Sequence, residues 1–390
     1  MTELDYRQIK NWHRSVVILF LFMGTAWAAL LTRMPLVKSS LAVTSTQLGL
    51  ILIAGGIGSL IGLNLIGRMI ASRGTKHWIM IFYPAAAILI IAGGMAIEAG
   101  QPIAYAIIGF GLGCTFGLTD VPVNVDGTEL EKLTSRNLMP RMHAGYSAGT
   151  LIGSGWGALA ASLNLGIMAT ILPFALVQAV IPFILNRHLP AGVGIEHKHH
   201  EDAPPAKWFS FVLVFLGLGI LGITLAEGGA GDWMTLGYKE GYGASEAEAG
   251  IGFSLFFLGM VVVRYFGGNL ADRIGKGRAL QLFAAVGVAG ILLVILSTPN
   301  LVLGWIGSVM WGAGVALGFP LFISAAGEGE NSARRVSFVA SWGYAAFLAG
   351  PPVLGLLADQ IGMLTMFYVM AAFMIMALFA AGTVRNKQRG

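Results

Sequence analysis

An acid and an amide lie one helical turn apart in the apolar stretch that covers residues 101–126. Asp120 and Asn124 are four residues apart, which places both side chains on one face of a helix, next to Pro122. A carboxyl group in a partly dry cavity can exchange protons, and a neighbouring amide can bind the hydroxyl groups of a solute. The spacing predicts that Asp120 carries a proton and that Asn124 binds substrate. The alternative is a structural hydrogen bond to a neighbouring helix.

A histidine and a tyrosine stand three residues apart at the start of the next apolar stretch. Histidine changes its charge between about pH 5 and 8, so His143 is a candidate proton relay alongside Asp120, with a structural role as the alternative. Tyr146 lies on the same helical face and can stack on a substrate ring or donate its hydroxyl group. Asp126 and Glu129 are expected to be solvated or to pair with a loop.

Two further acids bracket a glycine-rich run. Glu227 and Asp232 flank residues 228–231, a Gly-Gly-Ala-Gly sequence that is expected to interrupt a helix. An interrupted helix at membrane depth must line a cavity or be covered by protein. Together with Trp233, the two acids predict a gate or a substrate site toward the outside. For Asp232 the alternative is a position in the external interface.

Arg33 is the only basic residue near membrane depth in the first apolar stretch. We expect it to form an ion pair with Glu227 or Asp232 that closes the outer side. The alternative is that its side chain extends to the membrane surface.

Aromatic residues offer a binding surface of low specificity. Trp27, Trp342 and Tyr344 are candidate substrate contacts, because sugar-like solutes stack on such rings, although apolar drugs do so too.

Patterns typical of enzymes and metal sites are missing. Cys114 is the only cysteine, which excludes an intrachain disulfide and a CxxC metal site. No GxxxxGK[ST], GxSxG or HExxH sequence occurs, and no nucleophile–base arrangement was found, so we expect no enzyme activity, no cofactor and no resident metal. The histidines of residues 196–200 resemble a metal cluster, but acids and prolines flank them and a solvated linker is the preferred interpretation.

Composition determines the setting in which these residues act. Of 390 residues, 11% are charged and 56% are hydrophobic, and the mean hydropathy is +0.76. A soluble protein carries about 25% charged residues. Because so few charges cannot cover so much apolar surface, the composition excludes a cytosolic enzyme and a secreted disulfide scaffold.

The chain contains twelve apolar stretches, each long enough to cross the ~30 Å of a membrane interior as a helix of about 20 residues. They are residues 14–34, 45–67, 77–98, 101–126, 138–163, 165–187, 208–236, 245–270, 278–297, 301–326, 333–358 and 362–384. We therefore predict an all-α membrane protein.

The basic residues predict its orientation. Of the 24 Lys and Arg residues, all but Arg33, Lys38 and Lys239 fall at the two termini, in the even-numbered loops or in the ends of the apolar stretches that adjoin them. Positive loops stay in the cytoplasm, so both termini are predicted to be cytoplasmic. The net charge of +5 then reflects this topology, and no nucleic-acid partner is expected.

The chain also consists of two similar halves. Residues 67–74 align with 268–275, and Gly145-Tyr146 aligns with Gly343-Tyr344. We predict two pseudo-symmetric six-helix bundles, residues 1–187 and 208–390, joined by a cytoplasmic linker at 188–207. Such duplications are typical of secondary transporters, whose substrate sites lie near the midplane.

Glycine recurs every fourth residue in two of the predicted helices. Gly145, Gly149, Gly153 and Gly157 form one stripe, and such stripes let helix backbones approach closely in lipid. Static contact and a sliding interface are both compatible with this spacing.

Residues 268–278, GNLADRIGKGR, resemble the signature between the eighth and ninth spans of the major facilitator superfamily. The resemblance implies a tight cytoplasmic turn that latches one state of the transporter. Arg264, just upstream, is expected to belong to the same charge cluster. In the first half Ala71 stands where the signature has its acid, so any latch there must differ. The residues to which the resemblance assigns this role are Arg264, Gly268, Asp272, Arg273, Gly275 and Arg278.

Within that superfamily the chain looks most like a bacterial inner-membrane branch near the fucose permease-like transporters. The resemblance rests on residues 120–124, 141–147 and 227–233. In fucose permease-like proteins an acid four residues before an Asn is implicated in proton coupling, which corresponds to Asp120. Drug/proton antiporters usually carry an Arg in the fourth span and a Gly-Pro pair in the fifth, and neither occurs here.

These observations predict a monomeric, multi-pass transporter of the bacterial inner membrane, with a small solute, protons and lipid as its partners. The expected activity is proton symport of a small polar organic solute, such as a sugar, by alternating access. The alternatives are proton-driven efflux of an amphipathic drug or metabolite, and a sensor with a transporter fold that moves nothing.

Overall fold

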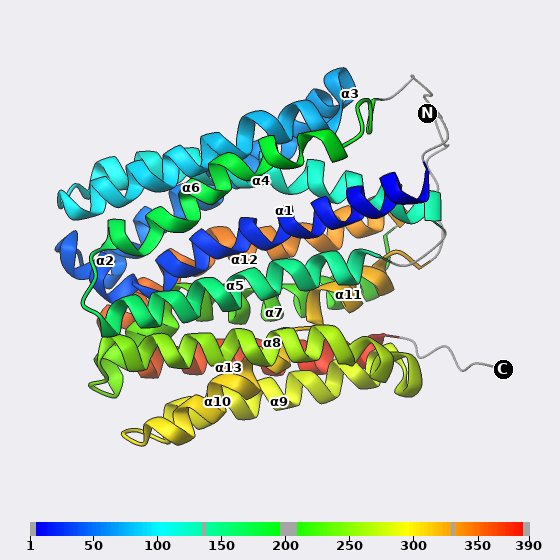
Figure 1. Cartoon of the computed structure of the whole chain (residues 1–390). Helices are drawn as coiled ribbons and strands as arrows, with labels where there is room; N and C mark the ends of the chain where they lie inside the picture. The colour runs from blue at the N-terminus through cyan, green and yellow to red at the C-terminus, as the bar shows by residue number, and fades with distance from the viewer. Residues whose placement is uncertain (1–4, 135–137, 196–208, 329–331, 385–390) are drawn as a thin grey trace. The chain divides into compact units, whose positions relative to one another are not determined.

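The computed structural model describes residues 5–134, 138–195, 209–328 and 332–384. Every regular element within these ranges is a helix, which confirms the all-α prediction (Figure 1). Helices satisfy all backbone hydrogen bonds locally, as a chain in lipid requires. The first-half helices are α1 (Tyr6–Thr32), α2 (Met34–Ser40), α3 (Ser45–Glu98), α4 (Pro102–Thr134), α5 (Met139–Ser162), α6 (Ile167–Leu185) and the 3-10 turn η1 (Asn186–His188).

The second half has a comparable series. Its helices are α7 (Phe211–Leu236), the π-helix η2 (Gly237–Gly241), α8 (Glu246–Ile274), α9 (Lys276–Leu296), α10 (Leu301–Val315), α11 (Gly318–Ala326), α12 (Ser332–Ile361), α13 (Met363–Ala380) and the 3-10 turn η3 (Ala381–Thr383).

Ten helical segments of the described ranges are long and apolar enough to cross a membrane. One of them, α3, has 54 residues and contains both predicted spans 45–67 and 77–98. Another predicted span, α5, is not among the ten, because its glycine, serine and threonine residues lower its hydropathy. The number of twelve spans therefore stays a prediction.

Two glycines mark corresponding turns in the two halves. Gly74 interrupts α3 with a φ of 76°, and Gly275 separates α8 from α9 with a φ of 92°. Both angles lie in the left-handed region, which only glycine adopts without strain. The two positions are equivalent in the aligned segments 67–74 and 268–275, so the repeat seen in the sequence is also a repeat of backbone geometry.

The chain forms two compact units. The first comprises residues 1–30, 39–42 and 54–201, and the second comprises 31–38, 43–53 and 202–390. The second unit thus includes two short segments that the predicted boundaries assign to the first bundle. The boundaries 1–187, 188–207 and 208–390 themselves stay a prediction.

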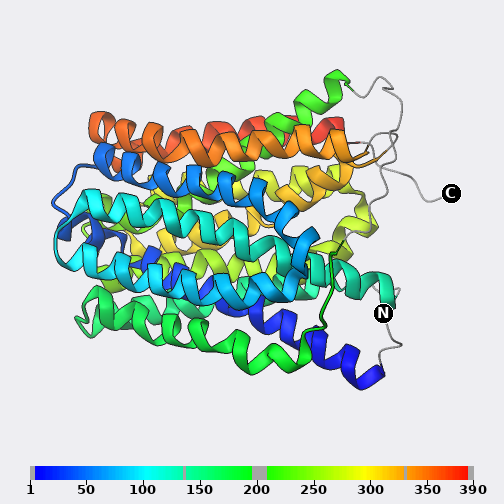
Figure 2. The ribbon, with the colours of Figure 1, turned by 90° about the horizontal axis from the view of Figure 1, so that it is seen from above.

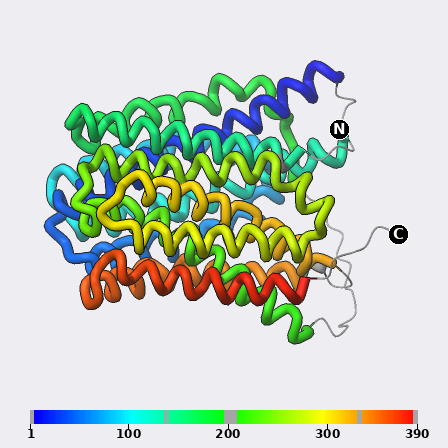
Figure 3. The backbone as a smooth tube through the Cα atoms, turned by 90° about the horizontal axis from the view of Figure 1, so that it is seen from below, coloured from blue at the N-terminus to red at the C-terminus, as the bar shows by residue number. Residues whose placement is uncertain are grey.

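In the second unit α7 contacts both α12 and α13, and α9 contacts α10 and α13. Figure 2 shows α12 and α13, in orange and red, side by side, and Figure 3 shows the same for the yellow helices α9 and α10. Large fully buried side chains, including Trp233, Trp311 and Phe367, fill the space between these helices.

Glycine stripes bring helix backbones together in both units. On α5 the stripe faces α1: a Cβ built on Gly145, Gly149 or Gly153 would lie 2.9, 1.9 or 2.1 Å from a carbonyl oxygen of α1. In the second unit Gly312 of α10 lies equally close to α8, with 1.8 Å to the oxygen of Phe256. The predicted close approach is confirmed, and on α5 it holds two helices of one unit together.

The predicted interruption of α7 is wrong, because residues 228–231 continue the helix. The glycines there make room for neighbouring side chains: a Cβ on Gly229 would lie 2.4 Å from the sulfur of Met370. The interruption occurs instead at residues 316–317, between α10 and α11.

Candidate functional site

Asp120 lies in α4 and is half-buried. The Nδ2 of Asn124 donates to the backbone carbonyl of Asp120 at 2.9 Å, so one donor of this amide bonds its own helix and its carbonyl oxygen stays available as an acceptor. No ion pair in the described ranges involves Asp120. The helix continues through Pro122 without a break.

His143 and Tyr146 lie on α5 in the same unit. The imidazole of His143 is exposed and lies against the ring of Phe20 in α1, with 4.9 Å between the ring centroids. Tyr146 is half-buried, as is Trp27 of α1. Their assigned roles in proton relay and substrate binding stay predictions.

Asp126 is not solvated, and of the two alternatives expected from the sequence the structure agrees with pairing to a loop. It is fully buried and accepts two hydrogen bonds, one from the indole Nε1 of Trp12 at 2.9 Å and one from the hydroxyl of Thr75. Thr75 follows the turn at Gly74, and its backbone N–H donates to the carbonyl of Val193. Asp126 therefore joins α1, the turn inside α3 and α4, next to the loop whose own acid is replaced by Ala71.

A salt bridge joins Glu227 of α7 to Arg264 of α8 inside the second unit. The carboxylate and guanidinium are 3.1 Å apart, and the side chains are 30% and 22% exposed. The Nε of Arg264 donates to the carbonyl of Ala316 at 3.3 Å, where α10 ends and α11 has not yet begun. Arg264 thus covers a carbonyl that the interrupted helix leaves without its regular partner. We expected Arg264 to belong to the charge cluster of the signature loop. Its described contacts are instead with Glu227 and with the carbonyl of Ala316.

This pair gives the first testable prediction. Replacing one partner leaves the other charge without its counterion inside a span, whereas replacing both removes the need for one. We expect Glu227→Gln and Arg264→Met each to lower the thermal midpoint of the purified protein, and the double variant to recover a large part of the loss. A double variant that loses as much as the sum of the two single variants would show that the pair is not coupled.

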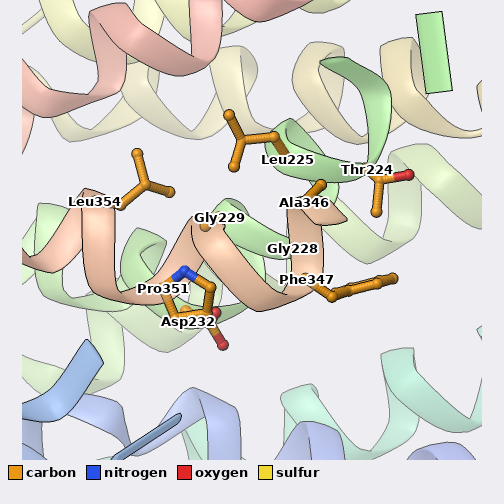
Figure 4. A pocket seen from close by; sticks show the side chains of 10 residues that line it. Thr224, Leu225, Gly228, Gly229, Asp232, Ala346, Phe347, Pro351 and Leu354 are labelled. Atoms are coloured by element: carbon orange, nitrogen blue, oxygen red, sulfur yellow. The ribbon is translucent and has the colours of Figure 1, made fainter. Parts of the chain in front are cut away.

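Asp232 and Trp233 have different surroundings. Asp232 is half-buried and lines a small pocket between α7 and α12, together with Thr224, Gly228, Phe347 and Pro351 (Figure 4). Trp233 is fully buried, and its ring lies against Gly355 of α12. Trp233 is therefore a core residue of the second unit, and its assignment as a gate residue stays a prediction.

Arg33 pairs with an acid that the sequence did not indicate. Its guanidinium lies 3.2 Å from Glu246 at the start of α8, instead of at Glu227 or Asp232, and the side chain is only 3% exposed. The alternative of an extended, solvated side chain is also excluded by this burial.

The aromatic candidates of α12 differ in exposure. Trp342 is half-buried and its ring covers Gly217 of α7, where a Cβ would lie 2.6 Å from the indole. Tyr344 is 38% exposed. Trp342 thus fills a gap between two helices, and its substrate contact stays a prediction.

The signature loop lies at the turn from α8 to α9. Gly275 takes the positive φ, and Asp272, Arg273 and Arg278 are exposed. A Cβ on Gly268 would meet nothing within 4 Å. Lys276 makes the described ion pair of this loop, with its ammonium group 2.9 Å from the carboxylate of Glu328, just after the end of α11. The same ammonium group donates a hydrogen bond of 2.9 Å to the hydroxyl of Ser324 within α11.

The proposed solvated histidines His197, His199 and His200, with Glu196, lie outside the described residues. Within the described ranges no group of three His, Cys, Asp or Glu side chains is arranged to hold a metal ion.

Comparison with known proteins shows similarity to one family of transporters. A sequence profile of the Major Facilitator Superfamily matches residues 207–389. An uncharacterized MFS-type transporter of Yersinia pestis is 26% identical over 94% of both chains. The multidrug resistance protein MdtG of Escherichia coli is 28% identical over 46% of this chain and 45% of its own.

Solved structures share the fold. The nucleoside transporter NupG superposes with a TM-score of 0.77 over 95% of this chain and 98% of its own, at 13% identity. The fucose:proton symporter FucP of E. coli superposes with a TM-score of 0.62 over 96% of this chain and 99% of its own, at 15% identity. The second half of the chain thus matches the profile of the Major Facilitator Superfamily, and the whole chain is similar in sequence to an MFS-type transporter and in fold to transporters of known structure.

Proposed function

We propose that this protein is a secondary active transporter that moves a small polar organic solute together with protons. In this proposal it is a monomer with twelve spans in two six-helix bundles and both termini in the cytoplasm of a bacterium, and it lies in the inner membrane. The observation that carries proton coupling is Asp120, a carboxyl group inside a span for which the described residues provide no cation. An ionised carboxylate at that depth needs a partner or is neutralised by a proton.

The polar groups of the two units would divide the work. Asp120 would bind and release the proton, and the free amide oxygen of Asn124, one turn away, would accept a hydrogen bond from a solute hydroxyl. In the second unit Glu227 and Arg264 are partly accessible and can exchange their mutual bond for bonds to a solute. The likeness to a nucleoside transporter and to a fucose:proton symporter supports a hydroxylated solute.

Efflux of an amphipathic compound is the second candidate, and the partial relative MdtG favours it. The direction of transport separates the two. Everted vesicles that acidify inside would accumulate an exported compound, whereas a symported solute would accumulate in vesicles of the native orientation.

The coupling role of Asp120 gives the second prediction. We expect Asp120→Asn in proteoliposomes to retain solute counterflow and to lose acceleration by a pH gradient, because the amide cannot release a proton. Fucose and a nucleoside are the first probes, after a screen for thermal stabilisation at acidic and neutral pH.

Glu129→Gln is the matched control, since it makes the same change on the same helix at a residue that pairs with Lys132. It should leave both counterflow and the pH response unchanged. An Asp120→Asn protein that responds to the gradient like the unaltered protein would remove Asp120 from the coupling mechanism. Ligand binding without counterflow would favour a sensor.

A further inference from the structure

Three acids of the second half hold two segments of the first half inside the second unit. The segments are residues 33–38 and 43–46, and the acids are Glu240, Glu246 and Asp359. We infer that these contacts form a latch on the predicted external side, with Asp359 as its central residue, and that the latch must open before the two segments can leave the second unit. This inference rests on the proposed alternating access.

Asp359 caps a helix that lies more than 300 positions away in the sequence. One carboxylate oxygen accepts the backbone N–H of Ser45 at 3.0 Å, and the other accepts the N–H of Thr46 at 2.7 Å and its hydroxyl at 2.6 Å. The first N–H groups of a helix have no partner within it, and the helix dipole makes that end positive. The start of α3 is therefore satisfied by a side chain of α12.

Two glycines bring these helices close enough for the cap. A Cβ on Gly49 of α3 would lie 2.4 Å from the carbonyl oxygen of Pro351, and a Cβ on Gly355 of α12 would lie 2.4 Å from that of Ser45. Asp359 follows Gly355 by one helical turn, so both lie on the face that α12 presents to α3. Close backbone contact and capping thus depend on the same face.

Two cations complete the latch on either side of the cap. The ammonium group of Lys38 lies 2.7 Å from Glu240 and donates to the hydroxyl of Ser45 at 2.8 Å. Arg33 lies 3.2 Å from Glu246. All the positive groups, including the α3 amino end, come from the two first-half segments, and all the negative groups come from the second half.

This arrangement also accounts for an exception in the sequence. Arg33 and Lys38 are two of the three basic residues that depart from the cytoplasmic bias of Lys and Arg. Their position on the predicted external side is explained if their ion pairs with Glu246 and Glu240 hold that side closed. Every ion pair and cap of the latch links residues of the predicted first bundle, 1–187, to residues of the predicted second, 208–390, so release of the two segments breaks all of them together.

The test measures how often the latch opens. In a Cys114→Ser background, Ser45→Cys provides a thiol at a position that is 1% exposed, and its alkylation by a membrane-impermeant maleimide reports opening. Each hydrogen bond to a charged group is worth a factor of about ten or more. We expect Asp359→Asn to raise the alkylation rate about tenfold or more, and Thr46→Val, which removes only the hydroxyl, to raise it less.

Glu248→Gln is the matched control. Glu248 also caps a helix start with a carboxylate, but it bonds Ser245 of its own turn. It should leave the alkylation rate of the thiol introduced at position 45 within about twofold. An Asp359→Asn rate equal to that of the background overturns the latch, and if this variant does not fold, an unchanged Thr46→Val rate does so. Because alkylation needs no substrate, failure of the transport assay would refute the proposed function and leave this result standing.

Discussion

Gly149→Ala is expected to prevent α1 and α5 from associating. A Cβ at this position would lie 1.9 Å from the carbonyl oxygen of Leu21, 2.8 Å from its carbon and 3.2 Å from its Cα. These are backbone atoms of a helix that has no freedom to rotate away, so the helices must separate along their whole contact. Overpacking costs about 1–3 kcal/mol in soluble cores, and we expect a loss at or above the upper end.

The measurement is the thermal midpoint and the monodispersity of the purified protein. Gly155→Ala is the matched control, because Gly155 lies on the same helix and a Cβ there would meet nothing within 4 Å. Alanine is the better helix former by roughly 0.5–1 kcal/mol, so this control should be neutral or stabilising. Equal midpoints for the two variants would show that the stripe tolerates a side chain and that the two helices are not in close contact.

Asp126→Ala is expected to have the second large effect. The substitution leaves the indole N–H of Trp12 and the hydroxyl of Thr75 without their acceptor in a site where Asp126 is 0% exposed. Each buried polar group without a partner costs about 1–3 kcal/mol, so for the two groups we expect a loss of roughly 2–6 kcal/mol in the free energy of unfolding. Asp126→Asn keeps one acceptor oxygen, so its free energy of unfolding should lie between that of the unaltered protein and that of Asp126→Ala.

The control for this prediction is Glu129→Ala, three residues further along α4. Glu129 contacts the exposed Lys132 at 3.4 Å, and such a surface pair contributes about 0–1 kcal/mol. Thermal unfolding of the three variants in one detergent measures the difference. A Glu129→Ala loss as large as that of Asp126→Ala would mean that Asp126 is not the residue that joins α1, α3 and α4.

The contrast between these neighbours shows where sequence reasoning ends. Asp126 and Glu129 lie one turn apart in α4, and both were expected either to be solvated or to pair with a loop. Their difference depends on Trp12 and Thr75, which lie 114 and 51 positions away and whose contact with α4 follows from how three helices associate. No local pattern carries that information.

The same limit applied to the gate. The sequence singled out Arg33 as a misplaced cation, but its partner depended on which of several acids lies nearest in space, and that acid is Glu246. Asp359 gave no signal at all, because a single acid near a helix end is common. Lys239, the third basic exception beside Arg33 and Lys38, neighbours Glu240 in η2 and was the local signal that pointed to this side.

The structural class of this protein follows from its composition and from the pattern of its apolar residues. Scarce charge and long apolar stretches allow only helices that satisfy their own backbone bonds, and glycine at equivalent turns repeats because a positive φ is a local requirement. Which carboxylates are buried, which cap a helix and which form ion pairs depends on the tertiary structure. Hydropathy and backbone geometry depend on residues that are close together in the sequence. The surroundings of a side chain depend on contacts between helices that can be more than 300 residues apart in the sequence.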